Sequence, residues 1–117
     1  ENIRRAGHVS RILYEAGLVV IASFISPIAE DRRRVRSLFT QGSFSEIHIK
    51  ADLEVCEARD PKGLYAKARA GAVKEFTGID SPYEVPLHPE LIIETNRATV
   101  EESLKRLLDF AVLRLKY

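Results

Sequence analysis

The segment from Arg59 to Glu84 reads RDPKGLYAKARAGAVKEFTGIDSPYE and lies between two more regular parts of the chain. Glycines interrupt it at near-regular intervals, at Gly63, Gly71 and Gly78. This polar composition and the repeated breakers argue against an element of the core. Loops of such length without regular structure are usually lids or disordered segments, and the residues here favour a lid.

The same segment combines positive charge with aromatic rings. Between residues 59 and 74 it carries five cationic side chains against one carboxylate, Asp60. Tyr65 and Phe76 lie among these charges. Cations bind phosphate and aromatic rings stack on a base, so the mixture suits a flat anionic ligand such as a nucleotide. A solvated surface loop with ordinary charge is the alternative that composition leaves open.

Several motifs of this segment resemble the lid of adenylylsulfate kinases, which phosphorylate adenosine 5′-phosphosulfate (APS). They are RDPKGLY at 59–65, KARAG at 67–71 and FTGIDSPYE at 76–84. Three motifs outside the segment match the same family in the same order: ENIRR at 1–5, AGLVVI at 16–21 and SFISP at 23–27. The resemblance therefore covers essentially the whole chain, and its independent motifs make it specific.

Composition bounds the class of protein. The 117 residues, 45% apolar and 30% charged, suffice for one small domain, and we treat residues 1–117 as a single partial domain with a lid at about 59–84. No apolar run has the length of a membrane span, and no signal peptide opens the chain. A net charge of +1 argues against nucleic-acid binding by bulk electrostatics. We expect a protein that binds neither membrane nor nucleic acid.

The cysteine and histidines point to no redox or metal chemistry. Cys56 stands alone and cannot form an intrachain disulfide, which favours a reducing, cytoplasmic location. His8, His48 and His88 lack the spacing of metal ligands, so we expect no metal site within this chain.

The first quarter of the chain predicts a helix followed by a buried strand. Apolar residues recur at three- and four-residue spacing over residues 3–16, and Gly17 ends that helix. Leu18 to Phe24 is a continuous apolar run, typical of a strand in a parallel sheet that is covered on both faces. Ser26 would then lie at the carboxyl edge of the sheet, where ligands bind in α/β folds. A turn or helix-cap role for Ser26 is the structural alternative.

The remaining chain predicts further helices and strands in alternation. The expected elements are a helix at Ala29–Gln41, a strand at Phe44–Ile49, a helix at Leu53–Ala58 capped by Asp52, a strand at Leu91–Glu94 and a helix opened by a Thr99–Glu102 capping box. This order predicts an α/β fold with a parallel sheet flanked by helices. The resemblance implies a P-loop kinase-like sheet with further strands before residue 1.

The phosphate-binding motif GxxxxGK[ST] does not occur in these residues. That loop cradles the nucleotide phosphates and supplies a hydroxyl to Mg²⁺. The resemblance places it upstream of residue 1, so we expect the carboxyl-terminal two-thirds of a kinase, inactive on its own. A truncated, inactive product is the other explanation.

The resemblance assigns Asn2, Ile25 and Ser26 to the APS pocket. Asn2 would contact APS from the first helix, while Ile25 and Ser26 would line the pocket. The family has a phosphoserine intermediate assigned at the position of Ser26. We favour direct in-line transfer, because a P-loop kinase needs no covalent step.

On the lid, the resemblance assigns Lys62, Glu75 and Phe76 to APS. Lys62 would reach the substrate, and Phe76 would stack on its adenine. Residues 70–76 read AGAVKEF, where the family usually has AGEIKGF. Glu75 therefore puts a negative charge and a stiffer backbone where a glycine is usual.

For ATP, the resemblance assigns Arg59 over the adenine, the main chain of Ala98 along the adenine pocket, and Arg69 near the phosphates. It implies transfer of the γ-phosphoryl group of ATP, with Mg²⁺, to the 3′-hydroxyl of APS, giving 3′-phosphoadenylylsulfate for sulfate assimilation. It also implies a homodimer, alone or fused or associated with an ATP sulfurylase. A non-catalytic nucleotide-binding or interaction module is the alternative function.

Overall fold

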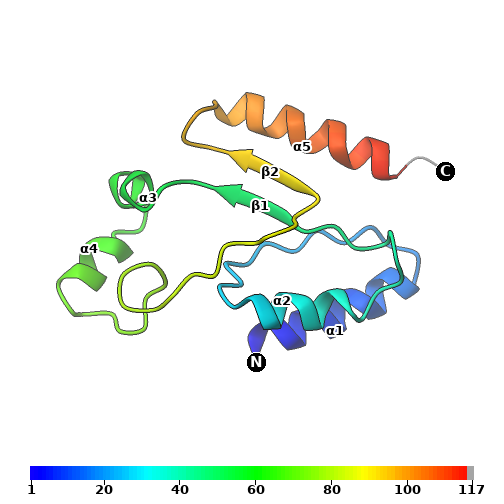
Figure 1. Ribbon diagram of the computed structural model, residues 1–117, viewed down its shortest axis with the longest axis horizontal. Coiled ribbons are helices and arrows are strands. Elements are labelled where there is room, and N and C mark those ends of the chain that lie inside the picture. Colours follow the sequence, from blue (N-terminus) through cyan, green and yellow to red (C-terminus); the bar gives the residue numbers. More distant parts are fainter. Residues whose placement is uncertain (116–117) are drawn as a thin grey trace. The chain divides into compact units, whose positions relative to one another are not determined.

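The structure is a computed structural model that describes residues 1–115 (Figure 1). The elements run in the order α1 (Asn2–Glu15), α2 (Ala29–Arg36), β1 (Ile47–Lys50), α3 (Leu53–Arg59), α4 (Leu64–Arg69), β2 (Leu91–Glu94) and α5 (Val100–Arg114). They form two compact units. The first unit comprises Glu1–Phe44 and Pro82–Pro86; the second comprises Ser45–Ser81 and the chain from Leu87 onward.

In the first unit, α1 packs against α2 (Figure 1). Gly7 of α1 is buried at this contact. A Cβ atom there would lie only 2.9 Å from Cγ2 of Val35 and 3.3 Å from Cδ1 of Leu38. The missing side chain therefore sets how closely the two helices approach.

In the second unit, β1 and β2 pair in parallel, with Ile49 opposite Ile93. Helix α5 packs on β2 (Figure 1). Ile93 of β2 is 1% exposed, and it is the largest fully buried side chain among the described residues. The core of this unit therefore centres on the second strand of the parallel pair.

The predicted α/β class with parallel strands is confirmed, as are several of its elements. The first helix ends at Glu15, with Gly17 beyond it at a φ of +87°. The predicted strand Leu91–Glu94 is β2. The capping box of α5 is complete: the Glu102 amide donates to Thr99 Oγ1 at 3.1 Å, and the Thr99 amide donates to Glu102 Oε2 at 2.8 Å.

The strand predicted at Leu18–Phe24 is wrong. These residues are irregular, and Ile21 is 91% exposed. A strand needs inter-strand hydrogen bonds, and within residues 1–115 none of the described ladders includes this run. A run of apolar residues does not by itself provide the neighbouring strand that would make these hydrogen bonds. Ser26 consequently does not follow a strand but lies in the loop that enters α2.

Other boundaries also differ from the prediction. Helix α2 ends at Arg36 rather than Gln41, because the amides of Leu38 and Phe39 bond three residues back and tighten the chain into a turn. The first strand begins at Ile47 rather than Phe44.

The segment predicted to be an irregular lid contains helix α4. Its start is held by Asp60, whose carboxylate accepts the amides of Tyr65 and Ala66 at 3.0 and 3.1 Å. Asp52 does precede α3 as predicted, but its side chain makes no capping bond there. Instead it accepts from Asn96 Nδ2 at 3.3 Å.

We predict that Gly7→Ala destabilises the 117-residue chain. The new methyl group would press on Val35, whose β-branched side chain has little freedom to move. Overpacking costs about 1–3 kcal/mol, which exceeds the gain of about 1 kcal/mol in helix propensity. Urea unfolding measures the change in the free energy of unfolding.

Val35→Ala is the matched second variant for this test. It removes the methyl groups that the new Cβ would meet, so Gly7→Ala should cost less in the Val35→Ala background than alone. Strictly additive effects would show that the two positions do not touch.

Candidate functional site

The residues predicted to form the site fall in both units. Asn2, Ile25 and Ser26 belong to the first unit, and Arg59, Lys62, Arg69, Glu75, Phe76 and Ala98 to the second.

Ser26 is half-buried and adopts a φ of +45°, a left-handed conformation unusual for a residue with a Cβ. Its carbonyl oxygen accepts from Arg32 Nη1 at 2.5 Å. Ile25 is 68% exposed. Asn2 is exposed at the start of α1, and no described hydrogen bond joins it to Ser26. The local fold thus fixes Ser26 while leaving Ile25 and Asn2 open to solvent.

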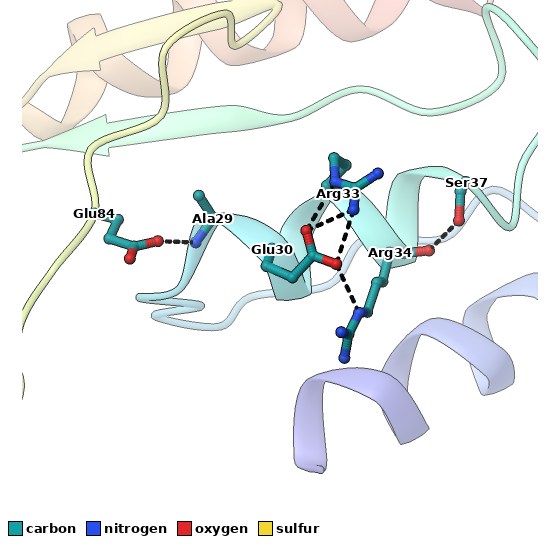
Figure 2. A network of polar contacts seen from close by, with 6 residues as sticks. All are labelled: Ala29, Glu30, Arg33, Arg34, Ser37 and Glu84. Carbon is teal, nitrogen blue, oxygen red and sulfur yellow. Dashed lines mark hydrogen bonds and ion pairs between the residues drawn. The ribbon is translucent and has the colours of Figure 1, made fainter.

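The N-terminus of α2 is closed by a residue far away in the sequence (Figure 2). The carboxylate of Glu84 accepts from the Ala29 amide at 2.5 Å. The next residue, Glu30, is bound by Arg33 and Arg34 one turn further along the helix, and these guanidinium groups hold the pKa of the Glu30 carboxyl below its usual value. Much of the positive charge of α2 is therefore paired within the helix.

Arg59 and Ala98, the residues that the resemblance assigns to the adenine of ATP, both line one groove of the second unit. The groove has a volume of about 570 Å³, and its apolar walls come from Ile49, Ile93, Leu104 and Leu107, among others. Arg59 is held at its edge: Nη2 donates to the Thr95 carbonyl at 2.8 Å and Nη1 donates to Thr95 Oγ1 at 3.1 Å. The result is a concave apolar site beside a fixed guanidinium plane.

A tight turn presents Phe76. Its amide and that of Glu75 both donate to the carboxylate of Asp80. The Phe76 ring meets the Tyr65 ring edge to face, with centroids 4.8 Å apart and an interplanar angle of 72°. Glu75 has a φ of +55°, a region that glycine enters without strain.

The two remaining cations of the predicted site differ in their surroundings. Lys62 is exposed in the turn between α3 and α4. Arg69 donates from Nη2 to Glu57 Oε1 at 2.5 Å. This bond raises the pKa of Arg69 and holds the pKa of the Glu57 carboxyl below its usual value. Arg69 is thus engaged with a carboxylate and not directed to an open anion site.

Sequence reasoning missed four residues that hold this geometry: Arg32, Asp80, Glu84 and Thr95. The one local signal lay at Asp80, because Asp is a common turn former and glycine occurs nearby at Gly78. The other three act on residues more than five positions away.

The model of the adenylylsulphate kinase family matches residues 1–94. The chain belongs to the adenylylsulphate kinase family. Among curated members, an adenylyl-sulfate kinase of Geotalea uraniireducens is 58% identical and aligns with 97% of this chain and 55% of its own length. One of Bacillus pumilus is 54% identical over 99% of this chain and 59% of its length. The chain thus spans about half the length of the curated relatives it matches.

Solved structures agree with this family. The Mycobacterium tuberculosis APS kinase CysC, in complex with AMPPNP and APS, matches with a TM-score of 0.82 and 42% identity over 91% of this chain and 62% of that chain. The crystal structure of APE1195 matches with a TM-score of 0.79 and 34% identity over 98% of this chain and 64% of that chain. The expected P-loop kinase fold class is therefore confirmed. This holds for the part of the chain that the two structures of the adenylylsulphate kinase comparison cover.

Two kinds of feature are absent from residues 1–115 of this family member. No helix there is both long and apolar enough to cross a bilayer. In the same residues, no group of three or more His, Cys, Asp and Glu side chains is placed to hold a metal ion.

We predict that Glu75→Gly stabilises the chain. A left-handed residue with a Cβ costs about 1–2 kcal/mol, and glycine removes that strain. Part of this gain is lost again to the greater freedom of glycine in the unfolded chain, which leaves an expected increase of about 1 kcal/mol in the free energy of unfolding.

Lys74→Gly is the control for this substitution. Lys74 is equally exposed but is not among the described residues with a positive φ, so glycine there should only destabilise. Urea unfolding of both variants decides the matter. Equal losses at the two positions would contradict strain at Glu75.

Proposed function

We propose that the protein carrying this chain transfers the γ-phosphoryl group of MgATP to the 3′-hydroxyl of APS, giving 3′-phosphoadenylylsulfate and ADP. The main support is the match to an APS kinase in complex with AMPPNP and APS, at 42% identity over 91% of this chain. At 42% identity, the two sequences align closely enough for their substrate-binding positions to be compared one by one.

The groove beside Arg59 is the proposed site for the adenine of ATP. A concave, mostly apolar site with a few placed polar groups is typical of such ligands. The guanidinium plane of Arg59 can stack on a flat base, and its two bonds to Thr95 leave it little freedom to lose on binding. Ala98 would line the same groove through its main chain.

Phe76, Glu75 and Lys62 are proposed to face APS from the lid. The turn held by Asp80 presents the Phe76 ring for stacking on adenine. Lys62 carries a compact charge suited to phosphate or sulfate oxygens. Asn2, Ile25 and Ser26, which belong to the first unit, are also proposed to contact APS. Arg69 could reach a phosphate only by leaving Glu57.

Phosphoryl transfer depends chiefly on positioning and on neutralising charge. Residues 1–117 lack the GxxxxGK[ST] motif that supplies the phosphate cradle, so we propose that this chain binds and orients nucleotides while the cradle comes from elsewhere. Mg²⁺ would enter as part of MgATP. Ser26 would act as a pocket residue, since in-line transfer requires no covalent intermediate.

The resemblance to the family also supports a cytoplasmic homodimer, free-standing or joined to an ATP sulfurylase, as a proposal. The alternative is a non-catalytic nucleotide-binding or interaction module that keeps the lid and the adenine groove. The two functions differ in whether residues 1–117 support turnover once a phosphate cradle is present.

We predict that residues 1–117 alone release no ADP in the presence of ATP and APS. A chimera in which residues 1–117 replace the matched segment of the Geotalea uraniireducens relative should form ADP and 3′-phosphoadenylylsulfate. Coupled ADP release and chromatography of the product measure both. A folded, nucleotide-binding but inactive chimera would favour the non-catalytic module, and activity of residues 1–117 alone would contradict the first expectation.

We predict that Phe76→Ala in the chimera weakens APS binding selectively. Base–aromatic stacking is worth about 1–3 kcal/mol, and KM for APS should rise by the corresponding factor while KM for ATP stays unchanged. Phe110→Ala, in α5 beside Arg114, is the control for loss of an aromatic ring. If Phe76→Ala raised both KM values equally, the ring would be a general anchor of the lid.

A further inference from the structure

We propose that Arg32 and Glu84 are positioning residues for APS: together they clamp Ser26 in its left-handed conformation. This inference rests on the proposed function, in which Ser26 lines the APS pocket. Neither Arg32 nor Glu84 is assigned to the ligand itself.

Ser26 is a point of backbone strain. Its φ of +45° is costly for a residue with a Cβ, and such conformations persist only where their surroundings hold them. The preceding residues 18–24 are irregular, so no strand fixes the approach to Ser26. Hydrogen bonds made by Arg32 and Glu84 supply the restraint.

Arg32 supplies one half of that restraint. Its guanidinium donates from Nη1 to the Ser26 carbonyl at 2.5 Å and from Nη2 to the Glu84 carbonyl at 2.6 Å. The two nitrogens of one planar fork thus join backbone positions 58 residues apart, since 84 − 26 = 58. A lysine at position 32 has a single ammonium and cannot reproduce the planar fork.

Glu84 supplies the other half. Its amide donates to the Pro27 carbonyl at 2.8 Å, and its carboxylate accepts the Ala29 amide at 2.5 Å (Figure 2). Two residues of the loop that follows Ser26, Pro27 and Ala29, are therefore bound to one residue. These bonds hold the carbonyl groups of Ser26 and Pro27. The φ of Ser26 therefore cannot change to an unstrained value without breaking the bonds from Arg32 and Glu84.

The clamp also ends the lid segment. Glu84 is the last residue of the segment 59–84, so the chain leaving the lid is bound to the loop that carries Ser26. A purely structural cap of α2 would need only the Glu84 carboxylate. The Arg32 fork is directed to Ser26, which is the observation that favours a role at the pocket.

The test uses the same chimera, with Arg32→Lys, Glu84→Ala and Glu84→Gln, and with Arg33→Lys as the control on the outer face of α2. Arg32→Lys and Glu84→Ala should lower kcat/KM for APS by about tenfold or more, since a displacement of about 1 Å at a site can cost up to a hundredfold. KM for ATP should not change. Glu84→Gln should recover most of the loss, because its amide oxygen can still accept from Ala29.

A second readout on the 117-residue chain does not depend on catalysis. The three-bond coupling between the amide and Cα protons of Ser26 reports φ, and Arg32→Lys should move it toward the value of extended backbone. An unchanged coupling, or equal losses for APS and ATP, would overturn the clamp. An inactive unmutated chimera in which the coupling still responds would count against the proposed function and not against the clamp.

Discussion

Carboxylates that accept backbone amides hold the irregular parts of this molecule. A two-stranded sheet and short helices leave many loop N–H groups without a partner, and an unpaired buried amide is costly. In the described part of the chain, the acidic side chains that accept amides of loops and helix starts include Asp60, Asp80, Glu84, Glu90 and Glu102. Bonds to an ionised acceptor are stronger than neutral ones, so each fixes a loop that regular structure does not.

These carboxylates coincide with backbone strain at the proposed site. Ser26 and Glu75 are the non-glycine residues with positive φ in the described part of the chain. Asp80 accepts the amides of Glu75 and Phe76, and Glu84 binds Pro27 and Ala29 directly after Ser26. Strain that persists under such restraint is a feature of binding sites, where it presets the backbone before the ligand arrives. Ser26 in the first unit and Glu75 in the second therefore each lie beside a carboxylate that accepts a backbone amide.

The elements that were predicted correctly depend on local sequence signals. Helix α1 follows an apolar stripe ended by Gly17, and α5 follows a capping box, so residues three or four positions apart contain the information. The wrong strand at 18–24 shows the opposite case. Its apolar run indicates only that burial would be favourable. A strand also requires hydrogen bonds to a neighbouring strand from elsewhere in the sequence. Helix α4 was hidden by its six-residue length and by flanking glycines.

The difference between local and long-range information also separates the proposed site residues from the residues that position them. The family resemblance proposes which residue types meet the ligand, because those lie in short motifs. It says nothing of Arg32 and Glu84, whose bonds join positions 52 and 55 residues apart in sequence. Position 75 shows why these distant partners matter: glycine would adopt its conformation without strain, but here a glutamate does so. The Asp80 carboxylate, which accepts the amides of Glu75 and Phe76, holds this turn in place with a glutamate at the left-handed position.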